Sequence, residues 1–89
     1  MALLDLSTEE ALERADVEKT GDALYDLGIL YSTGQGVEMD YVQAHKWFNL
    51  AALRGKNEAK DWRSEIAREM SMDEIAEAQR QAREWLSTH

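Results

Sequence analysis

The sequence contains no cysteine and no proline, and only five of its 89 residues are glycine. Without cysteine the chain forms no disulfide and offers neither a thiolate nucleophile nor a cysteine-based zinc site. The two histidines, His45 and His89, lie too far apart in the sequence for a local metal-binding pair. Because proline is absent and β-branched residues are few, the composition favours helix throughout. We therefore expect an all-α fold with no metal and no cofactor.

Long apolar stretches are missing as well, and none is long enough to span a membrane. The start, MALLDLSTEE, has no basic leader, so if Met1 is the natural start we expect a cytoplasmic protein. Hydrophobic residues make up 44% of the chain and charged residues 31%, which is typical of a folded domain. The length predicts one domain, residues 1–89, that is too small for an enclosed substrate cavity.

Negative charge is concentrated in the first half of the chain. Residues 1–40 hold ten acids and two bases, whereas residues 41–89 hold eight of each, and the net charge is -8. An acidic half repels nucleic-acid phosphates and anionic lipid headgroups, and no basic patch with interleaved aromatic residues offsets it. The charge therefore disfavours nucleic-acid and membrane partners.

The apolar spacing predicts four or five helices. Ser7 followed by Glu10 forms a capping-box pattern that opens a short acidic helix to about residue 18, and Thr20 and Gly21 interrupt it. Further helices are expected over 22–33 and, capped by Asp40, over 41–54. Asn57 is expected to cap a fourth helix, and Ser71 with Glu74 a fifth that begins beside residue 72.

Each predicted helix carries an apolar face at helical spacing. The expected buried positions are Leu24, Leu27, Gly28, Tyr31, Tyr41, Ala44, Trp47, Phe48, Ala51, Ala52, Ala59, Trp62, Ile66, Met70, Ile75, Ala78, Ala82, Trp85 and Leu86. Glycine within such a face is unfavourable in a helix, so Gly28 is expected to permit the close approach of another helix.

The paired glycines of YSTGQGVEMDY, residues 31–41, suggest either a phosphate-binding loop or a turn. A dinucleotide fingerprint requires a strand before GxGxxG, but Met39 occupies the third glycine position and the preceding residues read as helix. Gly34 and Gly36 are better explained as residues with positive φ that end one helix and reverse the chain.

Residues 23–59 resemble a Sel1-like repeat, a relative of the tetratricopeptide repeat. The resemblance is carried at the family's spacing by Leu27, Gly28, Tyr31, Gly34, Gly36, Val37, Asp40, Tyr41, Ala44, Trp47, Ala51, Ala52, Gly55 and Ala59. It implies a short right-handed solenoid of antiparallel helix pairs that acts as an adaptor or scaffold for other proteins, without catalysis. It also implies a capping helix over 7–20, a full repeat over 21–56, and a degenerate second unit over 57–87 that serves as C-terminal cap.

In relatives of this fold a second helix face lines the groove that binds a partner. Here the equivalent positions are Asp22, Tyr25, Asp26 and Ile29, with Asp61 and Glu65 on the matching helix of the next unit. These residues predict a partner that is a basic, partly apolar protein or peptide. The alternative is an ordinary solvated helix face, because Lys60, Arg63 and Arg68 lie close to the acids in the sequence.

His45 and the aromatic residues suggest a catalytic base and a ligand site, but each has a simpler explanation. His45 has no nucleophile placed in sequence to serve as its partner, so we expect a solvated or rim histidine rather than a general base. The aromatic residues could form a ligand box, but most lie on core stripes. Three function classes remain: an interaction module, a homo-oligomeric structural protein, and a small enzyme or regulatory subunit of an enzyme, ranked in that order.

Overall fold

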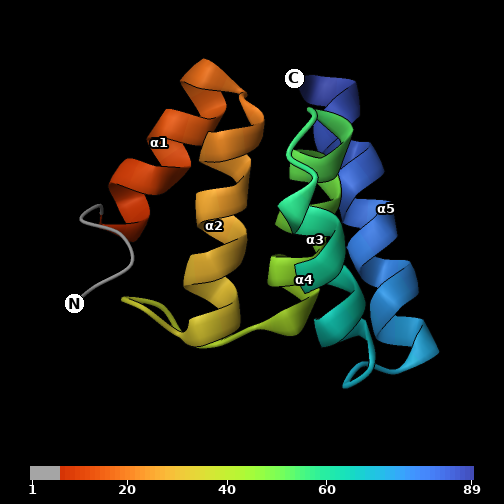
Figure 1. Cartoon of the computed structure of the whole chain (residues 1–89). Coiled ribbons are helices and arrows are strands. Elements are labelled where there is room, and N and C mark those ends of the chain that lie inside the picture. Colours follow the sequence, from red (N-terminus) through yellow and green to blue (C-terminus); the bar gives the residue numbers. More distant parts are fainter. Residues whose placement is uncertain (1–6) are drawn as a thin grey trace.

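The computed structural model describes residues 7–89, and within them the chain is built from helices and turns only. The helices are α1 (Thr8–Glu18), α2 (Gly21–Thr33), α3 (Tyr41–Leu53), α4 (Glu58–Ala67) and α5 (Met72–Thr88) (Figure 1). The predicted all-α fold class is therefore confirmed.

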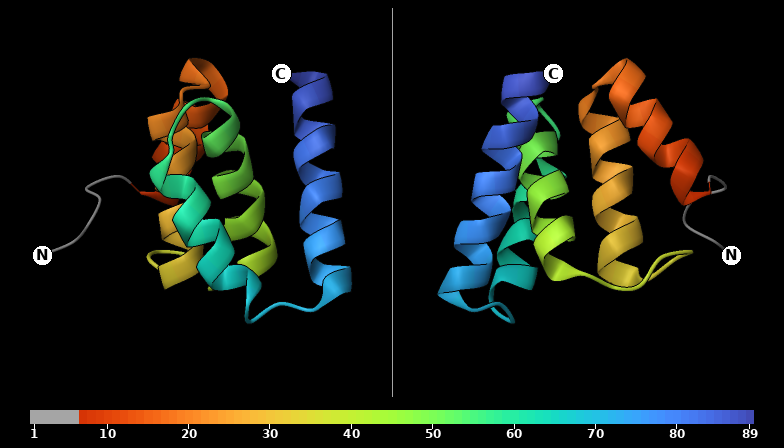
Figure 2. Two further views of the ribbon diagram at one scale, coloured as in Figure 1. Left: turned by 45° about the vertical axis from the view of Figure 1, so that its right-hand side comes forward. Right: turned by 180° about the vertical axis from the view of Figure 1, so that it is seen from behind.

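The helices alternate in direction, and α3 lies at the centre. In Figure 1, α1, α3 and α5 run one way while α2 and α4 run the other. Helix α2 packs antiparallel on α3, as the sequence predicted, and α1 packs on the far side of α2. Both α4 and α5 pack on α3 but make at most marginal contact with each other, and the two views of Figure 2 show α5 beside α3. Helix α3 thus has three neighbours and α4 has one main neighbour.

Side-chain caps fix most of the helix starts. The hydroxyl of Ser7 accepts from the Glu10 N–H, and Thr20 accepts from the Ala23 N–H, so Thr20 starts a helix as well as interrupting one. Asp40 accepts from the Val42 and Gln43 N–H groups, and Ser71 with Glu74 forms a complete capping box.

The cap predicted at Asn57 is wrong, because its side chain makes no capping hydrogen bond. A capping residue normally has an extended backbone, whereas Asn57 is already helical at φ -62° and ψ -34°. The first turn of α4 is closed by backbone bonds instead, with the Ala59 N–H donating to the Lys56 carbonyl at 3.1 Å.

The glycine loop between α2 and α3 is a turn. Gly34 and Gly36 have φ of 72° and 74°, the conformation expected of them. The Gly34 and Gln35 N–H groups both donate to the Leu30 carbonyl, at 2.9 and 3.1 Å, which ends α2. The Asp40 N–H then donates to the Tyr31 carbonyl at 3.0 Å, so the loop closes where α3 begins.

Phe48 lies at the centre of the core and is fully buried. Its ring is 5.7 Å from that of Tyr25 on α2 and stacks at 6.2 Å on that of Trp62 on α4, while Trp47 meets Trp85 edge-on at 6.1 Å. The expected core positions that the structure buries are Leu24, Leu27, Gly28, Ala44, Trp47, Phe48, Ala51, Ala59, Ile66, Ala78, Ala82 and Trp85.

Other expected core positions are less buried. Tyr31, Tyr41, Ala52, Met70 and Ile75 are half-buried. For two more the prediction is wrong, because Trp62 is 42% exposed and Leu86 is 40% exposed. Trp62 is left open since α4 has only one main neighbour, and Leu86 lies on the outer side of the last helix.

Gly28 allows α2 and α3 to come into close contact. A Cβ atom at this position would lie 2.5 Å from the Phe48 ring, a separation that real Cβ atoms do not adopt. Any side chain here must push Phe48 aside or separate the two helices.

We predict that Gly28→Leu lowers the free energy of unfolding by about 1 to 3 kcal/mol through overpacking, measured by urea denaturation. Ala76→Leu, at an exposed position of α5, is the control and should change stability by less than about 0.5 kcal/mol. Combining Gly28→Ala with Phe48→Leu should cost less than the sum of the single changes. An unchanged denaturation midpoint for Gly28→Leu would contradict the contact.

Candidate functional site

All six residues predicted to bind a partner lie on α2 and α4, the two helices that flank Phe48 on α3. We call this surface the α2–α4 face and define it by the residues Asp22, Tyr25, Glu58, Asp61, Trp62 and Glu65. Asp22, Glu58 and Glu65 have side chains that are 68%, 67% and 66% exposed. The structure therefore places exposed carboxylates from both helices beside the two aromatic rings that contact Phe48.

Lys56, in the loop between α3 and α4, joins the two helices at one end of this face. Its amine lies 2.8 Å from the Asp22 carboxylate, 3.7 Å from Glu58, and 5.1 Å from the centroid of the Tyr25 ring. The hydrogen bond with Lys56 lowers the pKa of Asp22, and the same bond raises the pKa of Lys56. A pocket of about 160 Å³ opens here, lined by Thr20, Gly21, Asp22, Arg54, Gly55 and Lys56.

Two of the residues predicted to bind a partner, Asp26 and Ile29, are not freely accessible at the surface. Ile29 is only 5% exposed, so it belongs to the core and is not an accessible anchor. The carboxylate of Asp26 is 19% exposed and bonds the Arg14 guanidinium of α1 at 2.5 Å. Both differences arise because α2 packs between α1 and α3, which leaves it only a narrow solvent-facing side.

Tyr25, Asp61 and Glu65 remain available on the α2–α4 face. Tyr25 is half-buried, Asp61 is exposed, and Glu65 makes a long ion pair of 3.6 Å with Arg68 one turn along the chain. Exposed pairs of this kind contribute little to stability, about 0 to 1 kcal/mol, and exchange readily with other charges.

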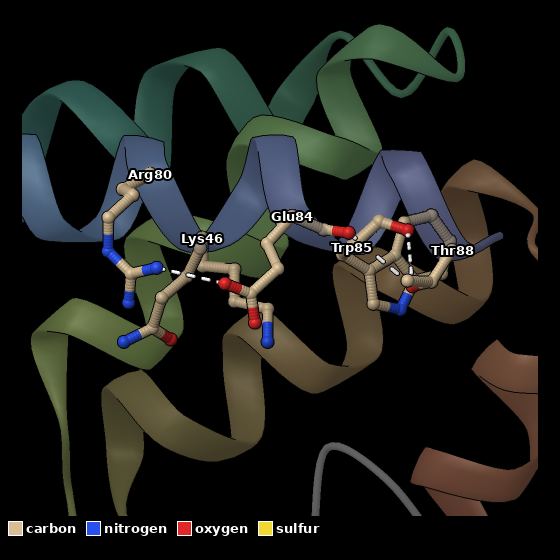
Figure 3. Close-up of a pocket in the computed structure, with 6 residues that line it drawn as sticks. Lys46, Arg80, Glu84, Trp85 and Thr88 are labelled. Atoms are coloured by element: carbon tan, nitrogen blue, oxygen red, sulfur yellow. Dashed lines mark hydrogen bonds and ion pairs between the residues drawn. The ribbon is translucent and has the colours of Figure 1, made fainter.

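A second site lies between α3 and α5, where a pocket of about 360 Å³ is lined by Lys46, Arg80, Gln81, Glu84, Trp85 and Thr88 (Figure 3). Arg80 bonds Glu84 at 2.9 Å and Glu77 at 2.6 Å. Lys46 lies with its amine 4.2 Å from the centroid of the Trp47 ring, and burial lowers the pKa of that amine. The carboxylate of this pocket is thus already paired with an arginine.

His45 is 4% exposed, so the prediction of a solvated or rim histidine is wrong. It is buried because α3 has neighbours on three sides, which covers even positions outside its main apolar stripe. The Nδ1 atom of His45 has no hydrogen-bond partner among the described residues. Burial, and to a lesser degree the charge of Arg63, lowers the pKa of His45.

Within residues 7–89, no group of three or more His, Asp or Glu side chains is arranged to hold a metal ion. In the same part of the chain, none of the helices combines the length and the apolar character that crossing a membrane requires.

Residues 21–56 match the family model of the Sel1 repeat. This stretch, from the start of α2 through α3 to Lys56, is therefore a Sel1 repeat, as the sequence resemblance indicated. Sel1 repeats are non-catalytic modules that generally mediate protein–protein interaction. Comparison with curated proteins found no match, and comparison with solved structures found none either.

Sequence reasoning missed Glu58 and Trp62 of the α2–α4 face, and it missed Lys56, which joins the two helices at one end of it. Trp62 was assigned to the core from its spacing to Ala59 and Ile66, although its neighbours Asp61 and Glu65 hint that it stands at the edge of an acidic surface. Lys56 follows Gly55 in a short loop, and nothing in its position along the chain indicates that it reaches Asp22 and Tyr25.

We predict that stability falls between pH 7.5 and pH 5.5 because of His45. Its pKa in the folded state is lowered from an unfolded value of about 6.5, so the unfolded chain binds the extra proton as pH falls below that value. The stability that neutral His45 contributes is fully present above the unfolded pKa and is lost as the pH falls below it. Urea denaturation at the two pH values measures the slope.

His45→Gln is the control, because it removes the titrating group and should flatten the slope. The carboxylate of Glu77, whose pKa the Arg80 hydrogen bond lowers to about 2, titrates below this range and does not obscure the result. If the free energy of unfolding changed equally with pH in both proteins, protonation of His45 would not be what destabilises the fold.

Proposed function

We propose that this protein is an interaction module, an adaptor or scaffold of the Sel1 type, that presents its α2–α4 face to a basic, partly apolar protein or peptide segment. The observation that carries the proposal is the arrangement around Phe48, where Tyr25 and Trp62 flank one buried ring and exposed carboxylates of α2 and α4 surround them. Aromatic residues anchor interfaces, and charges around them guide the encounter and select the partner.

The charge distribution supports a cationic partner. The chain carries a net charge of -8, and Asp22, Glu58, Asp61 and Glu65 all lie on the proposed face. Such a surface attracts cations and repels nucleic acid and anionic lipid. We propose that association is steered by these carboxylates and that the complex is held by contacts with Tyr25 and Trp62.

The arrangement of helices supports the proposal that residues 1–89 form one domain, in which a central repeat has a cap at each end. The family match ends at Lys56, and α4 and α5 then continue the alternation of directions while both pack on α3. We propose that residues 7–20 cap one end of the repeat and residues 57–87, the degenerate unit, cap the other. The module is proposed to act without catalysis, as Sel1 repeats do, and in the cytoplasm.

Self-association is the second candidate function, as in a homo-oligomeric structural protein. It is supported by large apolar side chains exposed on α5, because Met72 is 87% exposed and Leu86 40%. Sedimentation at high micromolar concentration should then give a mass above 10.2 kDa that falls on dilution. A monomeric mass throughout would remove this candidate.

We predict that Asp61→Lys combined with Glu65→Lys slows association with the partner by about tenfold, because long-range steering is reversed. The partner is first captured by affinity crosslinking from native lysate, and rates are then measured by surface plasmon resonance. Asp26 is unsuitable for this test because its charge holds Arg14. The association rate of the unaltered protein should also fall as salt rises.

The matched control is Glu9→Lys combined with Glu13→Lys on α1. This pair has the same spacing, is exposed and also starts in the first turn of its helix. It should leave association nearly as fast as in the unaltered protein. Equal slowing by both pairs would mean that only net charge matters, and unchanged rates in the Asp61 and Glu65 variant would place the binding surface elsewhere.

A further inference from the structure

Lys56 shows within this molecule how the α2–α4 face binds a cation. Its amine is placed 5.1 Å from the Tyr25 ring centroid, 2.8 Å from the Asp22 carboxylate and 3.7 Å from the Glu58 carboxylate. The aromatic ring attracts the cation through its quadrupole, while the carboxylates pair with the charge.

On α4, about one helical turn after Glu58, the aromatic ring of Trp62 likewise lies beside carboxylates. Its ring stacks on Phe48, with centroids 6.2 Å apart and planes inclined by 15°, yet the side chain is 42% exposed. At this centroid distance the two rings are offset, so Phe48 covers only part of the indole and leaves much of the ring open to solvent. Glu58 and Glu65 lie at i-4 and i+3 from Trp62 on the same side of α4. The indole thus separates the buried side of α4 from a row of carboxylates.

Among residues 7–89, no lysine or arginine lies over the ring of Trp62, whereas Lys56 lies over that of Tyr25. The three cation–aromatic contacts among residues 7–89 are made by Lys46 with Trp47, Arg54 with Trp85 and Lys56 with Tyr25. Within the described part of the chain, the ion pairs of Glu58 and Glu65 are long, at 3.7 and 3.6 Å, so that another cation can displace the present partner.

We propose that Trp62, with Glu58 and Glu65, binds an arginine side chain of an extended, basic partner segment. The guanidinium stacks on the open part of the indole and bonds the carboxylates, a combination that suits arginine better than lysine because the group is planar and forked. This inference rests on the proposed function and specifies what the α2–α4 face recognises. Trp62 is thus an exposed anchor, whereas Ile29, one of the positions predicted to bind a partner, is buried.

The experiment is a selection of displayed random twelve-residue peptides on the immobilised full chain, followed by fluorescence polarisation with the enriched peptides. The peptides should be rich in arginine. Replacing the arginine by citrulline, which keeps the shape without the charge, should weaken binding about tenfold, and replacing it by lysine should weaken binding less.

Protein variants test whether Trp62 is the arginine site. Trp62→Leu keeps an apolar side chain on Phe48 but removes the aromatic ring, and it should weaken binding about tenfold, whereas Trp62→Phe should weaken it less. Glu58→Gln with Glu65→Gln should weaken binding and reduce its dependence on salt. Glu9→Gln with Glu13→Gln, on α1, is the matched control and should bind as the unaltered protein does.

The inference is overturned if no peptide is enriched, if the enriched peptides lack basic residues, or if Trp62→Leu binds them unchanged. Its failure is distinguishable from failure of the proposed function. If the captured protein partner crosslinks to α2 and α4 while Trp62→Leu has no effect, the function stands and the arginine site does not. If those crosslinks lie only on α1 or α5, the proposed function itself is wrong.

Discussion

The contact between Gly28 of α2 and the ring of Phe48 of α3 is the constraint on which the rest of the structure depends. A hydrogen atom in place of a side chain lets the two helices approach until the Phe48 ring fills the space that a Cβ would occupy. Phe48 is held there with both of its other aromatic neighbours in place, Tyr25 on one side and Trp62 on the other. The packing requirement of one buried ring therefore determines the spacing of the two aromatic side chains on the α2–α4 face.

The position of each helix in the array decides which of its residues are free to act. Helix α3 has three neighbours, so it buries even His45 and serves as the support. Helix α2 has two neighbours and keeps a narrow solvent-facing side, on which Tyr25 and Asp22 lie. Helix α4 packs mainly on α3 and leaves Trp62 open. The exposed aromatic and acidic side chains thus occur where packing is incomplete, which is where a partner can complete it.

Local signals were sufficient to predict most of the fold. Apolar periodicity predicts the helices, and the caps at Ser7, Asp40 and Ser71 predict where three of them begin. The spacing of Gly34 and Gly36 predicts the turn. Each of these signals depends on residues close in sequence. Apart from the cap predicted at Asn57, a local signal that failed, the errors involve neighbours distant in sequence. Trp62, His45 and Ile29 were misplaced because an apolar stripe predicts that a helix packs on something, but not how many helices surround it. The bridge from Lys56 to Asp22 likewise depends on tertiary structure.

The proposed function requires that a basic protein segment binds across α2 and α4. The most direct measurement is backbone amide chemical-shift mapping by NMR, in which the isotope-labelled full chain is titrated with the segment of the partner that crosslinking identifies. We expect the largest shifts at Asp22, Tyr25, Asp61 and Trp62, with α1 and the outer side of α5 unchanged. Shifts confined to α1, or to the pocket between α3 and α5, would contradict it.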